Sequence, residues 1–214
     1  MFSLLGDIVY KISKEDVADT TCDVHVKFIR TGFIPDPEKM LLGDGTINYA
    51  ALVDNLIHDE ERFEFVKNII NSLDGQAIVL ANRVEYLERL NSECDKKSIC
   101  LSSLGNSKAA KAERKNALNK LNAGDEVNCV FATYQLAKEG LDVPNLRYIV
   151  FATPEKDETT ITQAAGRVGR KSDFKDFGTV IDLVDDFGMY NGWGKKRKSY
   201  YKKLEYEIIE DIFL

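Results

Sequence analysis

From Gly75 to Val184 the chain alternates short apolar segments with longer amphipathic ones, and this alternation limits the possible folds more than any other feature. The apolar segments are rich in valine and isoleucine, as strands covered on both faces are. Strands that alternate with helices form a parallel sheet with right-handed crossovers. We therefore predict an α/β fold with a mostly parallel central sheet flanked by helices. The expected strands are Ala77–Ala81, Ser98–Ser102, Asn128–Thr133, Arg147–Ala152 and Thr179–Val184, and the expected helices between them are Arg83–Glu93, Lys108–Leu121, Tyr134–Glu139 and Thr159–Arg167.

The region before this alternation predicts a short N-terminal β arm. Met1–Lys11 has the pattern of a short strand or hairpin, and Val24–Thr31 alternates like a half-buried strand. Pro35–Thr46 holds prolines and glycines and predicts a loop, while Asn48–Leu73 predicts two helices with a break near His58. We divide the chain into an arm packing on the domain (1–46), one main domain (47–190) and a basic aromatic C-terminal helix (191–214).

Composition excludes several classes of protein. The 214 residues are 44% hydrophobic, which is ordinary for a globular protein, and the net charge is -6, so any nucleic-acid surface must be local. No apolar run reaches the ~20 residues of a membrane span, and Met1–Lys11 lacks the features of a secretory signal. The four cysteines have no CxxC spacing and only two histidines accompany them, so we expect no metal site. We expect an intracellular, cytoplasmic protein without membrane contact.

The C-terminal segment Gly192–Glu207 is basic and aromatic together. The simpler interpretation is a solvated helix. The alternative is a surface that follows a phosphate backbone, with Trp193, Tyr200 and Tyr201 available for stacking.

The segment Gln163–Arg170 (QAAGRVGR) places polar and cationic side chains where a helix usually has apolar ones. In a helix, Gln163, Arg167 and Arg170 follow the i, i+4, i+7 spacing of a buried stripe. Gly166 and Gly169 each cost roughly 1 kcal/mol relative to alanine, which indicates that another group approaches the backbone closely. A polyphosphate, rich in oxygen acceptors, fits a stripe of guanidinium groups. The alternative is a solvated basic helix end before a loop.

A second candidate segment, Val127–Pro144, predicts a strand, a short helix and a glycine stop at Gly140. Thr133 at the end of the strand can offer a hydroxyl and a backbone N–H to a phosphate. Asp142 can accept hydrogen bonds from sugar hydroxyls, as acidic residues do in dinucleotide sites. Each residue also has a simpler interpretation, Thr133 as a helix N-cap and Asp142 as a turn residue before a proline.

The order and spacing of these segments resemble motifs V and VI of the superfamily 2 helicases, in the DNA-translocase and restriction-helicase branch. ATYQLAKEGLDVP matches the pattern AT-x-x-x-x-x-EG-x-D, and QAAGRVGR further on matches Q-x-x-GR-x-GR. Upstream, Gly75–Leu90 is similar to motif IV. Ser102–Gly105 and the following helix resemble the family's small-residue-glycine turn, with Leu104 in place of the usual threonine. The resemblance covers nearly the whole chain.

This resemblance implies the C-terminal, second RecA-like motor domain of a superfamily 2 DEAD/DEAH-type helicase or translocase, with a three-layer RecA-like fold. It implies ATP with Mg²⁺ as cofactor. It also implies a first RecA-like domain as partner, in the same full-length chain or in a separate subunit, which would hold the phosphate loop and the metal ligands. Near ATP it implies an arginine finger at Arg170 with Arg167 beside it, a nucleotide sensor at Gln163, and ribose-proximal roles for Gly140 and Asp142. At the DNA or RNA backbone it implies contacts from Thr133, Asn82, Arg83 and Gly105.

The chain contains no G-x-x-x-x-G-K-[ST] phosphate loop, so we expect it not to hydrolyse ATP by itself. An alternative function is a stand-alone nucleic-acid-binding or regulatory module with a degenerate helicase fold and no ATPase activity. A third interpretation, a Rossmann-like enzyme, lacks the glycine fingerprint after a first strand.

Overall fold

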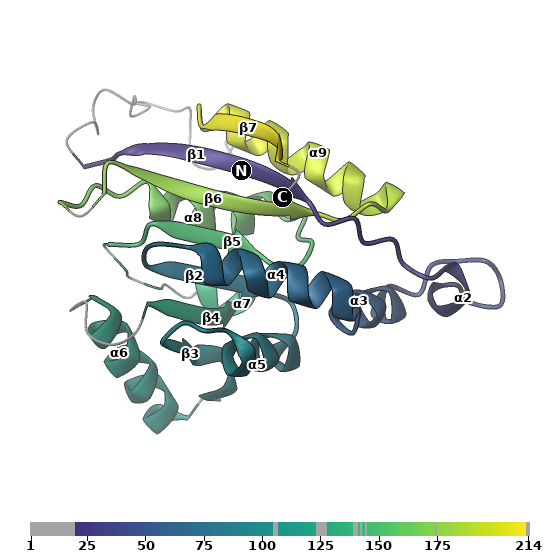
Figure 1. The fold of residues 1–214 in the computed structure, drawn as a ribbon, viewed down its shortest axis with the longest axis horizontal. Helices are drawn as coiled ribbons and strands as arrows, with labels where there is room; N and C mark the ends of the chain where they lie inside the picture. Colours follow the sequence, from purple (N-terminus) through teal and green to yellow (C-terminus); the bar gives the residue numbers. More distant parts are fainter. Residues whose placement is uncertain are drawn as a thin grey trace, which may run out of the picture.

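A seven-stranded sheet forms the centre of the protein (Figure 1). The computed structural model describes residues 20–104, 107–122, 128–138, 141, 143, 145–173 and 175–212. Neighbouring strands in the order β3-β4-β2-β5-β6-β1-β7 pair in parallel throughout this part of the chain. The strands are β1 (Asp23–Arg30), β2 (Ala77–Ala81), β3 (Ser98–Cys100), β4 (Cys129–Thr133), β5 (Tyr148–Phe151), β6 (Phe177–Val184) and β7 (Glu207–Ile212). The predicted α/β fold with a parallel sheet is confirmed.

Helices cover both faces of the sheet and make three layers (Figure 1). One face packs against α3 (Tyr49–Ile57), α4 (Glu60–Ser72) and α5 (Val84–Glu93). The other packs against α6 (Lys108–Asn122), α7 (Tyr134–Lys138), α8 (Glu158–Val168) and the C-terminal part of α9 (Gly188–Lys203), whose Tyr190 joins the core on the first face. The strands and helices predicted between Gly75 and Val184 are confirmed and differ only at their ends, and the break near His58 separates α3 from α4.

Strand β2 shows why the apolar segments are continuous and not alternating. All its residues are buried, with Val79 in the core under α3, α4 and α5 and Ile78 and Leu80 in the core on the opposite side. Because successive side chains of a strand point to opposite faces, a strand covered on both faces needs an apolar residue at every position.

The first strand lies inside the sheet. Strand β1 pairs with β6 on one side and with β7 on the other, so the predicted strand Val24–Thr31 contributes to the main sheet. Strand β7 was not predicted, because acidic residues interrupt its apolar pattern. The helix predicted for 191–214 ends at Lys203, and a turn with Glu205 at φ 57° leads into β7.

The segment Pro35–Thr46 differs from its prediction as a loop. The predicted loop Pro35–Thr46 contains a short helix, α2 (Pro37–Met40), because Asp36 caps it by accepting from the Glu38 N–H at 3.0 Å. The predicted strand or hairpin Met1–Lys11 lies outside the described residues.

Helix α9 is not solvated all round, as its simpler interpretation required. Arg197 and Tyr201 are buried, and Arg197 Nε donates to Asp182 Oδ2 at 2.8 Å. The Tyr201 hydroxyl donates to the same carboxylate oxygen at 2.8 Å, so this ring is not available for stacking on a ligand. Trp193 is half-buried, with the Lys156 ammonium 5.2 Å from its ring centroid. One face of the basic segment is therefore part of the core.

A second buried ion pair holds the carboxyl end of β6 on the other face. Arg62 of α4 donates from Nε to Asp185 Oδ1 at 2.6 Å and from Nη2 to Oδ2 at 3.1 Å. It also donates to the Ala152 carbonyl at 2.8 Å and to the Tyr86 hydroxyl at 3.1 Å. Burial alone would lower the pKa of Arg62, but the Asp185 carboxylate raises it above its ordinary value. The guanidinium stays charged and ties the ends of β5 and β6 to α4.

Across the described ranges, no helix is long and apolar enough to cross a membrane. The same residues include no cluster of His, Cys, Asp and Glu that could hold a metal ion.

Candidate functional site

The C-terminal half of α8 and the end of α7 enclose a shallow, open hollow of about 310 Å³. Its lining residues are Lys138, Gln163, Gly166, Arg167 and Arg170. Three of them are cations and none is apolar, so the hollow suits an anion rich in oxygen atoms. The three residues of the predicted stripe therefore do meet in one place.

Helix α8 turns this stripe away from the sheet because its opposite face is apolar. Ile161, Ala165 and Val168 are fully buried against the strands. Asp157 begins the helix by accepting from the Thr160 N–H at 2.8 Å. Hydrogen bonds from Thr160, its hydroxyl first, lower the pKa of the Asp157 carboxyl. The helix is thus fixed at its start and along one face, which leaves Gln163 and Gly166 exposed.

Arg167 is half-buried and holds the two walls of the hollow together. Its Nη1 donates to the Leu141 carbonyl at 2.5 Å and its Nη2 to the Ala137 carbonyl at 2.7 Å. These bonds join α8 to the end of α7 and to the segment after it. The geometry gives Arg167 a positioning role in addition to its place in the lining.

Arg170 lies beyond the helix, although its spacing predicted a helical position. Helix α8 ends at Val168 with Gly169 as its C-cap, and Arg170 forms an antiparallel bridge with Thr21. The Cys22 N–H donates to the Gly169 carbonyl at 2.8 Å, which draws the chain toward the start of β1. Even so, the exposed Arg170 side chain lines the same hollow as Arg167.

The C-terminus of α8 is held by a buried lysine. Lys175 Nζ donates to the Val168 carbonyl at 2.7 Å and to the Leu146 carbonyl at 2.5 Å. A cation near a helix C-terminus also interacts favourably with the helix dipole. Burial lowers the pKa of Lys175. This contact fixes the point at which the chain leaves α8 toward Arg170.

The two glycines of the stripe have different structural reasons. A Cβ on Gly169 would lie 3.1 Å from Val24 Cγ2, so this glycine admits strand β1. Apart from its own helix backbone and chain neighbours, a Cβ on Gly166 would meet no atom of the described residues within 4 Å, and Gly166 lines the hollow. Packing within the described residues therefore does not require a glycine at 166.

Lys138 lines the hollow, although its sequence context did not mark it as a candidate. It is the last residue of α7, and its Nζ lies 3.5 Å from Asp157 Oδ2 at the start of α8. In the sequence, Lys138 stands out only by its place directly before Glu139-Gly140 of the segment that resembles motif V. The crossover between α7 and α8 brings it to the arginines.

Two candidates for the sugar end of a nucleotide, Gly140 and Asp142, lie outside the described residues. Their described neighbours Leu141 and Val143 are buried. The roles assigned to Gly140 and Asp142 stay predictions.

Three of the four remaining candidates, Asn82, Arg83 and Thr133, lie at the carboxyl ends of β2 and β4, which are neighbours in the sheet. Ala81 pairs with Thr133, and the exposed Asn82 and half-buried Arg83 follow directly. Asn82 Nδ2 donates to the Pro154 carbonyl at 3.1 Å, and Arg83 Nη2 lies 3.8 Å from Asp54 Oδ1. We call Asn82, Arg83 and Thr133 together the polar edge. Gly105 lies outside the described residues.

Thr133 is positioned by its neighbours on this edge. Its N–H donates to Ser102 Oγ at 2.7 Å, and its Oγ1 accepts from the Leu136 N–H at 3.3 Å. The second bond is the N-cap interaction that was its simpler interpretation. Thr133 thus begins α7, and it is half-buried.

Comparison with known proteins identifies the family. Residues 61–172, more than half of the chain, match the helicase conserved C-terminal domain. The chain is 25% identical over 168 residues to "Putative ATP-dependent RNA helicase L396" of Acanthamoeba polyphaga mimivirus, covering 75% of this chain and 30% of that protein. It is 25% identical over 225 residues to "Putative helicase 22" of Sulfolobus islandicus filamentous virus, covering 99% of this chain and 39% of that protein.

Among solved structures, T4 UvsW has the same fold, with a TM-score of 0.65 at 19% identity over 90% of this chain and 42% of UvsW. The chain thus spans less than half the length of each of these proteins. The family match agrees with the parallel sheet between two layers of helices and with the cationic residues at the end of α8. The chain belongs to the helicase conserved C-terminal domain family and has a RecA-like fold like that of T4 UvsW.

Proposed function

We propose that this chain acts as the second motor domain of an ATP-dependent nucleic-acid helicase or translocase, and that the hollow beside α8 receives the phosphates of ATP. The observation that carries the proposal is the open backbone at Gly166, which faces a hollow lined by Lys138, Arg167 and Arg170. A glycine without an internal packing reason, next to three cations, suits a polyphosphate that approaches the helix backbone closely.

The cations contribute differently. Arg170 is exposed and serves as the arginine finger, stabilising charge that develops on the transferred phosphoryl group. Arg167 donates to two backbone carbonyls and so fixes the position of α8 relative to α7. Lys138 adds a third positive charge, and Gln163 offers an amide at the rim. Arginine fingers contribute about 10³ to 10⁵ in rate when the rest of a phosphate site is present.

The remainder of the ATP site is assigned to a first RecA-like domain, in the same full-length chain or in a separate subunit. The donors that line the hollow suit phosphate oxygens and not a metal ion, and we assign no Mg²⁺ ligand to the described residues. Mg²⁺ held by the first domain would neutralise charge on the β- and γ-phosphates. The chain alone is therefore expected to bind phosphates weakly and not to hydrolyse ATP.

The polar edge is proposed to contact the backbone of DNA or RNA. Thr133 and Arg83 can donate to phosphate oxygens, and Asn82 can donate or accept. Such contacts position a strand and carry no sequence information, so we expect binding without base preference. Movement of this domain relative to the first one would shift these contacts along the strand.

The hollow can be tested on this chain directly. Titration of ATP and of inorganic tripolyphosphate, followed by NMR of backbone amides and arginine side chains, should shift signals of α8 and the end of α7. Arg170→Ala and Lys138→Ala should each weaken the shifts, whereas Lys196→Ala, an exposed cation on α9, should not. Equal responses in all three variants would overturn the assignment of the hollow.

The catalytic role needs both domains. Joining a phosphate-loop domain in front of this chain should produce an ATPase stimulated by nucleic acid. In that protein, Arg170→Ala should reduce kcat by about 10³ or more while the protein still folds. Full activity in this variant would exclude Arg170 as the finger. Binding of nucleic acid with no ATPase in the joined protein would favour the stand-alone binding module.

A further inference from the structure

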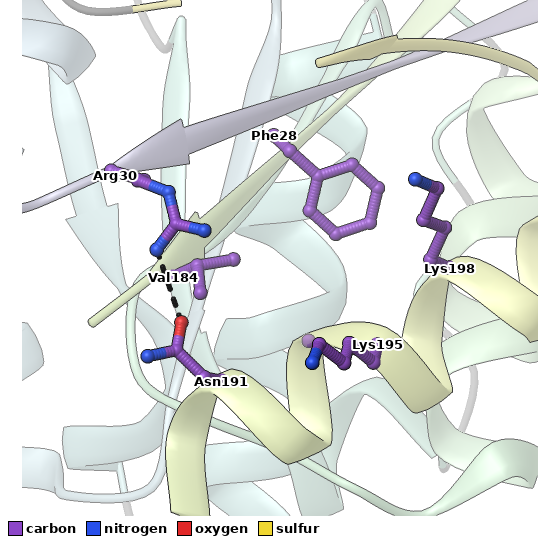
Figure 2. A pocket seen from close by; sticks show the side chains of 7 residues that line it. Phe28, Arg30, Val184, Asn191, Lys195 and Lys198 are labelled. Carbon is purple, nitrogen blue, oxygen red and sulfur yellow. Dashed lines mark hydrogen bonds between the residues drawn. The ribbon is translucent and has the colours of Figure 1, made fainter. Parts of the chain in front are cut away.

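A second cavity, of about 380 Å³, lies between β1 and α9 (Figure 2). Its lining residues are Phe28, Arg30, Val184, Asn191, Gly194, Lys195 and Lys198. None of them belongs to the hollow beside α8 or to the polar edge. Two strand residues, an aromatic ring and an arginine, thus face two lysines from the helix.

Helix α9 presents two lysines to this cavity. Asn191, Lys195 and Lys198 follow the i, i+4, i+7 spacing and share one face of α9. The contacts that bury α9 come from a neighbouring face, which carries Arg197 and Tyr201. Within the described residues, Lys195 is exposed and forms no ion pair.

The backbone of α9 lies close to the sheet beside this cavity. A Cβ on Gly194 would lie 3.3 Å from both methyl groups of Val184, so a larger residue would push the helix outward. This close approach keeps the first turns of α9 near the ends of β1 and β6. Lys195 and Lys198 consequently line the same cavity as Phe28 and Arg30.

The strand side contributes a ring and a fixed cation. Phe28 is half-buried, and Tyr201 packs against it edge-to-face with centroids 5.9 Å apart. Arg30 Nη1 donates to Asp186 Oδ1 at 2.7 Å. It also donates to Asn191 Oδ1 at 3.1 Å (Figure 2). The ring therefore has a defined orientation, and Arg30 closes one end of the cavity.

We propose that this cavity binds one nucleotide unit, with the base against Phe28 and the phosphate near Lys195 and Lys198. Aromatic stacking beside a cationic groove is how proteins hold single strands without reading their sequence. Arg30 and Val184 end their strands, so one end of the cavity lies at the same carboxyl edge of the sheet as Thr133 and Asn82. The nucleotide can come from a passing single strand or from a free mononucleotide, and only the first source rests on the proposed function.

The test compares matched variants of the full chain. Lys195→Gln combined with Lys198→Gln removes two charges inside the cavity, and Lys196→Gln combined with Lys202→Gln removes two exposed charges of the same helix outside it. Phe28→Leu keeps an apolar side chain but removes the ring. Binding of a short labelled oligothymidylate is measured by fluorescence anisotropy over a salt series, and binding of thymidine monophosphate by NMR.

For a single strand, the Lys195/Lys198 variant should lower the affinity and reduce the log–log salt slope by about 0.7 for each phosphate that the protein no longer neutralises. Phe28→Leu should weaken binding at least about fivefold and leave the slope unchanged. Thermal unfolding checks that this variant folds, and the lysine variants decide alone if it does not. If thymidine monophosphate shows the same variant dependence and the oligonucleotide does not, a free nucleotide is the ligand.

The proposal is overturned if the Lys195/Lys198 variant binds both ligands as the Lys196/Lys202 variant does, or if the unaltered protein binds neither. Arg83→Gln reports on the polar edge separately. A loss of oligonucleotide binding in that variant, with none in the Lys195/Lys198 variant, would remove the cavity and leave the proposed function in place.

Discussion

Gly166→Ala should have opposite effects on stability and on nucleotide binding. Beyond its own helix backbone and chain neighbours, a methyl group at this position meets no atom of the described residues within 4 Å. Alanine inside a helix is favoured over glycine by up to about 1 kcal/mol. For a domain of this size, that gain corresponds to an increase in Tm of about 2–4 °C. The same methyl group would project into the hollow that also contains Arg167 and Arg170, where a phosphate would approach the backbone.

The matched control is Gly192→Ala. Gly192 lies in α9, outside the hollow, and a Cβ there also meets no atom of the described residues within 4 Å beyond its own helix backbone and chain neighbours. Both variants should raise Tm in thermal unfolding followed by circular dichroism. Only Gly166→Ala should weaken the NMR shifts that ATP or tripolyphosphate produces. A lower Tm for Gly166→Ala would show that the helix is packed more tightly than described, and equal nucleotide binding in both variants would refute the site.

Three further predictions concern what holds the site. Gly178→Ala should destabilise the protein by about 1–3 kcal/mol in urea unfolding, because its Cβ would lie 2.1 Å from the Val168 carbonyl oxygen; an unchanged midpoint would contradict this close approach. Asp185→Asn should lower the free energy of unfolding by about 3–5 kcal/mol because it leaves the buried Arg62 charge without its partner. The double variant Arg62→Met/Asp185→Leu should be less destabilised, and additive losses of the two single substitutions would argue against the pair. The Asp157 carboxylate has a lowered pKa, so its stabilisation is present above the unfolded pKa and is lost as pH falls through the folded value. Asp157→Asn should therefore lose stability less steeply than the unaltered protein below about pH 4, and coincident acid-unfolding curves would exclude this contribution.

The sheet was predictable because burial on two faces leaves a pattern that can be read locally. A strand such as Ala77–Ala81 is apolar at every position, and the helices beside it have their own period. Strand β7 lies at the edge of the sheet, where burial is incomplete, and its acidic residues conceal it. The two buried ion pairs had no local signal either, because Asp182 and Asp185 find their arginines on different helices on opposite faces.

The sequence by itself determined the fold class and the family resemblance, and it marked Gln163–Arg170 as a candidate site, because these depend on spacing along the chain. Only the tertiary structure separated the roles within that segment. It assigned Gly169 to packing against Val24 and left Gly166 open, and it showed that Arg167 bonds to α7 while Arg170 lies beyond the helix end. It also brought Lys138 to the same hollow. The physical reason is that a site between two helices depends on how the crossovers pack, and packing joins residues whose separation in sequence carries no signal.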